Sequence, residues 1–209
     1  FIFMAYNLSV MKVFPFKIPK TKEDSLIYQE DVEFVFYDKL HQHEEIQISY
    51  IENGEGTIFV GDTISPYQKG DIVVIGSNLP HVFRSETNTN ELSVMLTLFF
   101  TANSFGKDFF MLPALKDIQP FWENSRNGFV VNSPSSKTVK CFKKIKKVNE
   151  LDRFILFLEI TKKLSKDKKV PLSSYIYDKK ITDNEGKRMQ TVFEYVMTNF
   201  QKNITLEEI

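Results

Sequence analysis

All three histidines of this 209-residue chain lie between positions 41 and 81, and imidazole is the side chain best suited to metal binding and proton transfer near neutral pH. His41 and His43 are two residues apart in a predicted strand, so their side chains share one face, as do those of Glu45 and Gln47. His81 follows a turn that contains proline and begins another predicted strand. If these strands close into a barrel, three imidazoles and the Gln47 amide converge in its interior.

Such a cluster has three chemical uses. It can hold Zn, Fe or Ni, it can form hydrogen bonds with a neutral ligand, or it can be a set of satisfied polar residues in a core. The nearest candidate for a fourth metal ligand is Gln47, whose amide brings no charge to offset a cation. Glu45 could replace it only if the strand contained a bulge. We therefore predict a ligand pocket, assign no metal to it and expect no cofactor.

The elements that would position these residues are strands. Residues 32–100 contain short runs of alternating apolar and polar residues, separated by turn signals. Asn53-Gly54-Glu55-Gly56 is a hairpin signal, because Asn and Gly tolerate the positive φ of tight turns. Many short strands without intervening helices predict an antiparallel barrel or jelly roll. We expect strands at 32–37, 46–51, 57–60, 72–75 and 92–100, and we expect Ile46, Ile48 and Tyr50 to face outward.

The second half of the chain predicts helices, so the expected fold class is α+β. Residues 133–136 form a loop that ends at a helix N-cap, and Asn149 caps a further helix with an apolar stripe. The clearest helical periodicity covers residues 187–200. Thr205-Leu-Glu-Glu208 is a capping box for a helix that would begin at Leu206. We therefore expect the natural chain to continue past Ile209.

Composition excludes several classes of protein. The 27 basic and 27 acidic residues balance, but residues 1–100 carry 7 basic and 14 acidic side chains and the remainder carries 20 and 13. The single cysteine excludes a disulfide framework and a Cys-rich zinc module. No apolar stretch is long enough to span a bilayer, and no secretory signal is apparent, so we predict a cytoplasmic protein without membrane contact. The lysine clusters after residue 136 are predicted to form solvated helix faces.

A resemblance to a known family rests on the order of several motifs. His41-Gln-His43, Gly54 and Gly56, Gly70-Asp71 and Pro80-His81 resemble the two cupin motifs. The whole order resembles AraC-type transcription regulators, which carry a cupin barrel, then dimerisation helices, then two helix-turn-helix units. Residues 188–209 look like the first helix of the AraC-type DNA-binding domain and the start of its second.

The resemblance implies a division of the chain into four parts. Residues 1–20 would be an N-terminal arm, 21–104 an antiparallel cupin sensing barrel, 105–180 a helical dimerisation region, and 186–209 a linker with the start of a truncated helix-turn-helix domain. The helices that enter the DNA groove would lie beyond Ile209. The regulator would therefore contact DNA only through a domain that this sequence does not contain.

We accordingly predict a sensor and not an enzyme. By the resemblance its effector is a sugar or another small metabolite, and its partner is a second copy of the chain. The alternative is a cupin metalloenzyme, a dioxygenase or isomerase that uses His41, His43 and His81. The residues expected to bind the effector are Tyr37, His41, His43, Gln47, His81 and Phe83, and those expected at the dimer contact are Leu151, Phe154, Ile155 and Leu158.

Overall fold

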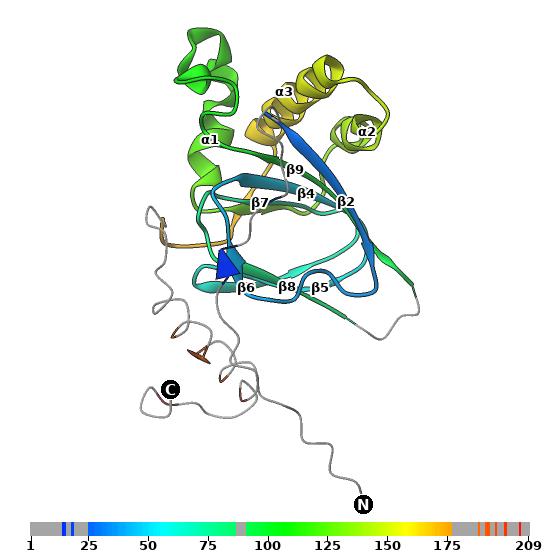
Figure 1. The fold of residues 1–209 in the computed structure, drawn as a ribbon, viewed down its shortest axis with the longest axis vertical. Helices are drawn as coiled ribbons and strands as arrows, with labels where there is room; N and C mark the ends of the chain where they lie inside the picture. Colours follow the sequence, from blue (N-terminus) through cyan, green and yellow to red (C-terminus); the bar gives the residue numbers. More distant parts are fainter. Residues whose placement is uncertain are drawn as a thin grey trace, which may run out of the picture.

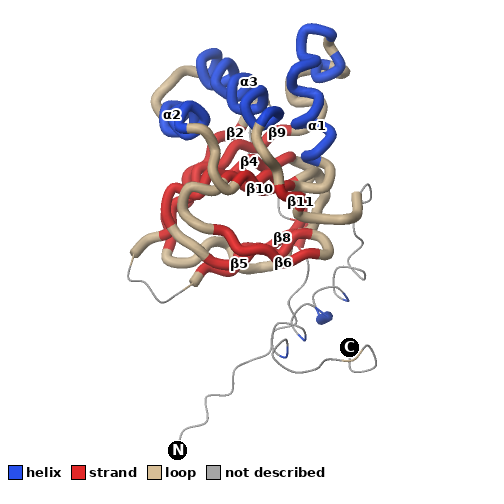
Figure 2. Tube along the Cα trace, turned by 180° about the vertical axis from the view of Figure 1, so that it is seen from behind, coloured by secondary structure: helices blue, strands red, loops and turns tan. Residues whose placement is uncertain are grey.

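The computed structural model describes residues 14–15, 18, 25–86 and 91–176, together with the single positions 188, 191, 192, 195, 199 and 205. Two β-sheets lie opposite one another, and helices cover the outer face of one of them (Figures 1 and 2). The fold is mostly antiparallel with added helices, which confirms the predicted α+β class.

The two sheets divide the strands between the two walls of the barrel. Among the described residues, the strand pairs are antiparallel except the pairing of the first strand with the third. One sheet has the order β1 (Phe14–Pro15), β3 (His41–Gln42), β8 (His81–Ser85), β5 (Gly56–Val60) and β6 (Thr63–Tyr67). The other has the order β11 (Val170–Pro171), β10 (Phe129–Val131), β7 (Ile72–Ile75), β4 (Ile46–Asn53), β9 (Ser93–Phe100) and β2 (Ile27–Glu33).

Three local predictions were wrong. The strand expected at 32–37 ends at Glu33, and the run that follows it crosses from one sheet to the other. His41 and His43 do not share a strand, because β3 ends at Gln42 and β4 begins at Ile46. The turn at 53–56 is not a hairpin, since β4 pairs with β7 and β9 while β5 pairs with β6 and β8. In each case the backbone changes sheets where the local pattern predicts a continuous strand or a hairpin turn.

The helical layer follows the predicted caps. It contains two 3-10 segments (Phe109–Met111 and Pro113–Ile118), α1 (Gln119–Ser125), α2 (Ser136–Ile145) and α3 (Glu150–Lys166). The Ser135 side chain accepts a hydrogen bond from the backbone N–H of Thr138, and the Asn149 side chain accepts one from that of Asp152. β10 and β11 were not predicted; they extend the barrel from within the region expected to be helical.

The main core lies between the helices and the sheet that contains β4 and β9. As expected, Ile46, Ile48 and Tyr50 face outward from the barrel and are buried under the helices. The Phe157 side chain is completely buried there, with its ring centroid 4.7 Å from that of Phe100 and 5.4 Å from that of Phe105. Apolar packing therefore fixes α3 against the outer face of the barrel.

Replacing Phe157 with Ala should lower the free energy of unfolding by about 3–5 kcal/mol, because the substitution removes buried apolar area and leaves a cavity. Urea unfolding followed by circular dichroism measures this change. Lys166→Ala, an exposed position in the same helix, is the matched control and should change stability by less than about 0.5 kcal/mol. A loss below about 1 kcal/mol for Phe157→Ala would contradict the packing described here.

The opposite charges of the two halves of the chain meet at this layer. Lys143 Nζ in α2 lies 2.9 Å from Glu52 Oε1 in β4, and Lys146 pairs with Glu30 in β2. Within the second half, Lys162 Nζ in α3 lies 3.6 Å from Asp117 Oδ2. Part of the lysine cluster therefore pairs with acidic groups of the same molecule, and exposed pairs of this kind each contribute less than about 1 kcal/mol.

Parts of the C-terminal prediction lie outside the described residues. Within the helix expected at 187–200, the individually described positions Arg188, Thr191, Val192, Tyr195 and Asn199 are helical. The capping box that begins at Thr205 is otherwise not described, and the same holds for most of the predicted arm at 1–20. In the described part of the chain, no helix combines the length and apolar character needed to cross a bilayer.

Candidate ligand-binding site

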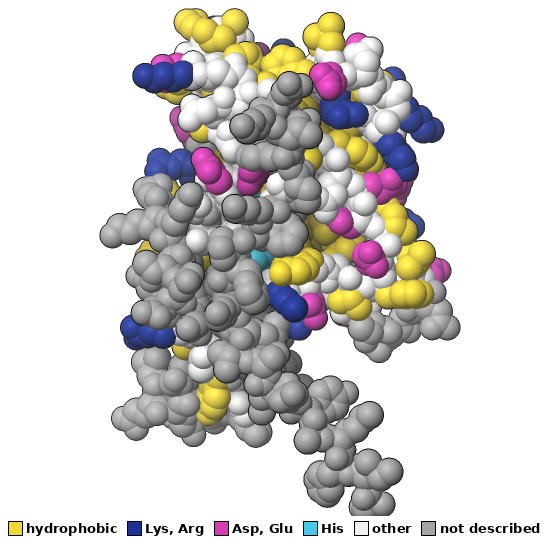
Figure 3. Space-filling view, viewed as in Figure 1, with side chains coloured by type: hydrophobic (Ala, Val, Ile, Leu, Met, Phe, Trp, Pro, Cys, Tyr) yellow, Lys and Arg dark blue, Asp and Glu magenta, His cyan; other side chains and the backbone are white. Residues whose placement is uncertain are grey.

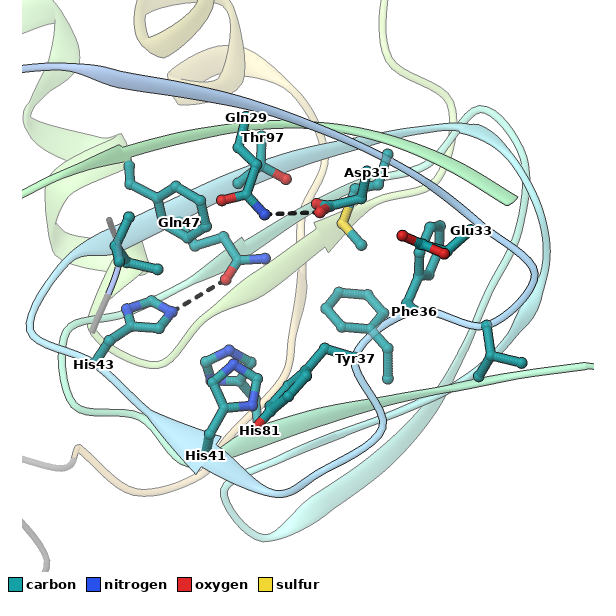
Figure 4. Close-up of a pocket in the computed structure, with 15 residues that line it drawn as sticks. Gln29, Asp31, Glu33, Phe36, Tyr37, His41, His43, Gln47, His81 and Thr97 are labelled. Atoms are coloured by element: carbon teal, nitrogen blue, oxygen red, sulfur yellow. Dashed lines mark hydrogen bonds between the residues drawn. The ribbon is translucent and has the colours of Figure 1, made fainter. Parts of the chain in front are cut away.

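A cavity of about 350 Å³ lies between the two sheets (Figure 4). The structure brings all six predicted ligand residues together around it: Tyr37, His41, His43, Gln47, His81 and Phe83. Tyr37 is 42% exposed, whereas the three histidines beside it are buried, so the histidine cluster itself is enclosed. Figure 3 shows a small patch of histidine on this face of the molecule. Binding of a ligand by these residues stays a prediction.

Strand register and one loop contact bring the histidines together. His41 in β3 lies directly opposite His81 in β8, and their ring centroids are 4.1 Å apart. His43 lies just after β3, and its backbone carbonyl accepts a hydrogen bond from the N–H of Asn78 in the loop before β8. The His43 ring centroid is 5.0 Å from that of His81. Two segments distant in sequence thus form one cluster.

Backbone hydrogen bonds fix the tautomer of each imidazole. A carbonyl oxygen only accepts, so a neutral histidine bonded to it through Nδ1 carries its proton there and leaves a lone pair on Nε2. Each Nδ1 lies 2.8–2.9 Å from such an oxygen, that of Lys39 for His41, Glu45 for His43 and Leu79 for His81. Figure 4 shows the three rings gathered at one end of the pocket. This end therefore presents three nitrogen acceptors.

Burial keeps these rings uncharged. Burial lowers the pKa of His41 to about 4. It also lowers the pKa of His43, although Gln47 and Glu45 favour the charged form. The pKa of His81 lies well below its ordinary value, because this ring is fully buried and has the other two histidines beside it. At neutral pH the cluster consists of neutral imidazoles.

A chain of side-chain contacts holds Gln47 against this cluster. Gln47 Oε1 lies 3.2 Å from His43 Nε2, and Gln47 Nε2 donates to Ser49 Oγ at 2.8 Å. Ser49 Oγ lies 2.9 Å from Thr97 Oγ1 in β9. With His43 protonated on Nδ1, Oε1 and Nε2 are both acceptors. If the Gln47 amide is rotated by 180°, its NH2 group donates a hydrogen bond to His43 Nε2. In the present orientation, both acceptor atoms could instead bind a cation placed beside them.

The residues fit a divalent transition metal. The ligand atoms of His41, His43 and His81 lie within 4.8 Å of one another. The Nε2 atom of His81 is buried without a hydrogen-bond partner among the described residues, so it is available to a ligand. Histidines that bind metals usually donate their other N–H to a carbonyl or carboxylate, as all three do here. His41, His43 and His81 would hold the ion, and Gln47 is the nearest fourth group.

Glu45 does not complete this ligand set. Its Oε2 atom lies 3.9 Å from His43 Nδ1, behind the imidazole and away from Nε2. Glu45 is buried but does not line the pocket. A site with three imidazoles and one amide would leave the whole charge of a divalent ion uncompensated by its protein ligands.

The residues that form the remaining walls of the cavity were not predicted from the sequence. Gln29, Asp31 and Glu33 come from β2, and Met95, Thr97 and Phe99 come from β9. Ile18, Val35 and Phe36 complete the lining. In β9 the alternation provided a signal, because Leu96, Leu98 and Phe100 lie in the core under the helices and the residues between them must face the barrel. Alternation also places Gln29, Asp31 and Glu33 on one face of β2, but the bounds of this strand were predicted incorrectly.

The four residues predicted at a dimer contact fall into two groups. Leu151 and Ile155 are 67% and 47% exposed. Phe154 and Leu158 are half-buried and pack against the main core, and the Phe154 ring centroid is 4.7 Å from that of Phe105. Only the first pair is therefore presented on the surface of α3.

Residues 35–99 match the family model of the Cupin domain. The chain thus contains a cupin domain, which includes all six predicted ligand residues. The matching solved structures include a cupin 2 conserved barrel domain protein from Rhodopseudomonas palustris, 25% identical over 40% of this chain and 57% of that chain, with a TM-score of 0.32.

Two further matches are oxalate decarboxylases. The Bacillus subtilis protein is 20% identical, with coverage of 37% of this chain and 21% of that chain and a TM-score of 0.32. The Lactobacillus farciminis protein in complex with formate is 18% identical, with coverage of 36% and 23% and a TM-score of 0.31. This chain thus covers between about a fifth and three fifths of the proteins that it matches. No curated protein matches the sequence.

Proposed function

We propose that this chain is the effector-binding and dimerisation part of an AraC-type transcription regulator. The observation that carries the proposal is the pocket of the cupin barrel, where a buried acceptor, His81 Nε2, has no partner among the described residues. The order of the chain supports it, because the cupin domain precedes a helical layer and a C-terminal segment that resembles the start of a helix-turn-helix domain. A small molecule in this pocket would bias the arrangement of the attached DNA-binding domains.

The segment that leaves the helical layer lies close to the histidine end. The backbone carbonyl of Leu79 accepts a hydrogen bond from His81 Nδ1. Leu79 and Leu172 both lie beside Gly128: a Cβ added to this glycine would be 3.1 Å from Leu79 Cδ2 and 3.5 Å from Leu172 Cβ. Two residues farther on, Ser174 donates to Asp62 from its backbone N–H at 3.0 Å. Leu172, in the segment that follows the helical layer, thus belongs to the same apolar cluster as Leu79, which lies two residues before His81.

Selection of random-sequence duplex DNA by the full-length protein tests the proposal. The full-length protein should enrich a defined sequence with two half-sites about one helical turn apart, as expected for a dimeric helix-turn-helix protein. Residues 1–209 alone, which lack the groove-binding helices, serve as the control and should enrich none. Failure of the full-length protein to enrich any sequence would contradict DNA binding.

The exposed apolar pair on α3 favours a second copy of the chain as partner. Replacing Leu151 and Ile155 together with Glu should weaken dimerisation by about tenfold or more, because it places charges in an apolar contact. Analytical ultracentrifugation over a concentration series measures the dissociation constant. Lys162→Glu, an exposed change in the same helix, should leave that constant within about threefold. An unchanged constant for the double variant would remove α3 from the contact.

The second candidate function is a cupin metalloenzyme, and the three convergent imidazoles favour it. A resident metal would supply Lewis acidity, and the residues of the chain would orient a substrate beside it. This reading predicts stoichiometric metal in the protein as purified and its loss in His43→Ala. A protein that is purified without metal and is stabilised by a metabolite would count against it.

A further inference from the structure

The wall of the cavity opposite the histidines carries two carboxylates that take no part in the histidine cluster. Asp31 and Glu33 are two residues apart in β2, and both line the pocket. Figure 4 shows them across the cavity from the histidine end. Asp31 Oδ1 accepts a hydrogen bond from Gln29 Nε2 at 2.7 Å, which orients the carboxylate. The pocket therefore has an acidic wall in which a hydrogen bond orients the half-buried Asp31, while Glu33 lies at its exposed end.

The charge of the described lining disfavours an anionic ligand. The described residues that line the pocket include two carboxylates and no Lys or Arg. A carboxylate or phosphate inside this cavity would meet like charges without a compensating cation. The lining favours a ligand with positive charge.

The hydrogen-bonding groups lead to the same conclusion. The carboxylates can only accept hydrogen bonds. His81 is 1% exposed, and its Nε2 atom is a hydrogen-bond acceptor without a partner among the described residues. His81 lines the same cavity as the acidic wall, and its unpartnered Nε2 atom points to a ligand independently of that wall. A ligand that satisfies both ends must donate hydrogen bonds at each.

Aromatic rings lie between the two ends. Phe36 and Phe83 line the cavity with their ring centroids 5.9 Å apart, and the Tyr37 ring centroid lies 4.9 Å from that of His41. Aromatic faces attract organic cations, particularly where water is partly excluded. A neutral polyol would satisfy the acceptors but would leave the charge of the half-buried Asp31 uncompensated.

We infer that the pocket takes a small organic amine, with its ammonium group against Asp31 and Glu33 and a second N–H or O–H donor at His81 Nε2. The inference rests on the proposed sensing function, because it identifies the class of the effector. It requires only binding and no chemical change in the ligand.

A binding screen with three sets of small molecules of matched size tests the inference: primary amines, neutral polyols and carboxylates. Each set is added to the protein in the presence of a chelator, and binding is measured by ligand-detected NMR followed by titration. Amines should bind at least about tenfold more tightly than their size-matched polyols and carboxylates. Displacement of the amines by one another would place them in one site.

The matched variants remove two charges each. Asp31→Asn with Glu33→Gln should weaken amine binding by about tenfold or more, whereas Glu55→Gln with Glu86→Gln, exposed positions that do not line the pocket, should change it by less than about twofold. Native circular dichroism and an unchanged unfolding midpoint show that each variant is folded.

The outcomes separate this inference from the proposed function. Preferential binding of polyols or carboxylates, or amine binding that survives loss of both carboxylates, would overturn the amine and leave a sensing pocket. Binding by none of the three sets would overturn the sensing pocket as well. Amine binding that depends on Asp31 and Glu33 would support both.

Discussion

Acidifying the metal-free protein from pH 7.5 to pH 5 should lower its free energy of unfolding, by about 2 kcal/mol through His41 alone. In the unfolded chain a histidine has a pKa of about 6.5. In the folded protein burial lowers the pKa of His41 to about 4 and lowers those of His43 and His81 as well. Below pH 6.5 the unfolded state therefore binds more protons, so stability is greatest above this pH and falls as the pH drops.

Urea unfolding in the presence of a chelator, at steps between pH 7.5 and pH 5, measures this dependence. The pKa values of Asp31 and Asp71 are raised by burial, and these carboxyls act in the opposite direction because the folded state binds their protons first. The series therefore ends at pH 5, above the ordinary carboxyl range of about 4. His41→Asn should reduce the slope by up to about 1.4 kcal/mol per pH unit. Equal stability at both ends of the range would contradict burial of neutral imidazoles.

Nickel or zinc ions should stabilise the protein through the same three side chains. At a free concentration one hundred times the dissociation constant, a ligand that binds only the folded state raises the free energy of unfolding by about 2.7 kcal/mol. Loss of one imidazole should weaken the affinity by at least about one hundredfold, since even the loss of a supporting hydrogen bond weakens metal sites by 10–100-fold. Isothermal titration and urea unfolding with His81→Asn measure both effects.

The chain offers a clear background for this experiment, because it contains no histidine outside the cluster. Gln47→Ala is the informative companion variant. A smaller loss of affinity than in His81→Asn is expected if the neutral amide is only an auxiliary ligand. A metal response that persists unchanged in His81→Asn would show that the ion binds elsewhere, and the three imidazoles would then serve only as hydrogen-bond acceptors.

The barrel and its histidine cluster were predictable because they depend on local periodicity and chemistry. Alternation placed Ile48 under the helices and Gln47 in the cavity, and the side-chain caps Ser135 and Asn149 marked the starts of α2 and α3. The convergence of His41 with His81 was expected from the closure of the barrel, and the register of β3 with β8 shows how it is achieved.

The acidic wall and the sheet changes were not predictable in the same way. The turn at 53–56 has the composition of a hairpin, but β4 and β5 belong to opposite sheets, and only long-range pairing decides this. The Asp31 and Glu33 side chains reach the cavity because β2 pairs with β9 along its whole length. β10 and β11 contain three and two residues, too few to produce a periodic signal.

The source reading frame beyond the codon for Ile209 tests the central claim, that this cupin domain is the sensor of a DNA-binding regulator, most directly. We predict that the frame continues for roughly 80–90 residues and encodes the rest of the helix that the capping box at Thr205 predicts. It should also encode a second helix pair with a basic recognition helix. A stop codon immediately after Ile209 would contradict the claim, because no element would then remain to enter the DNA groove.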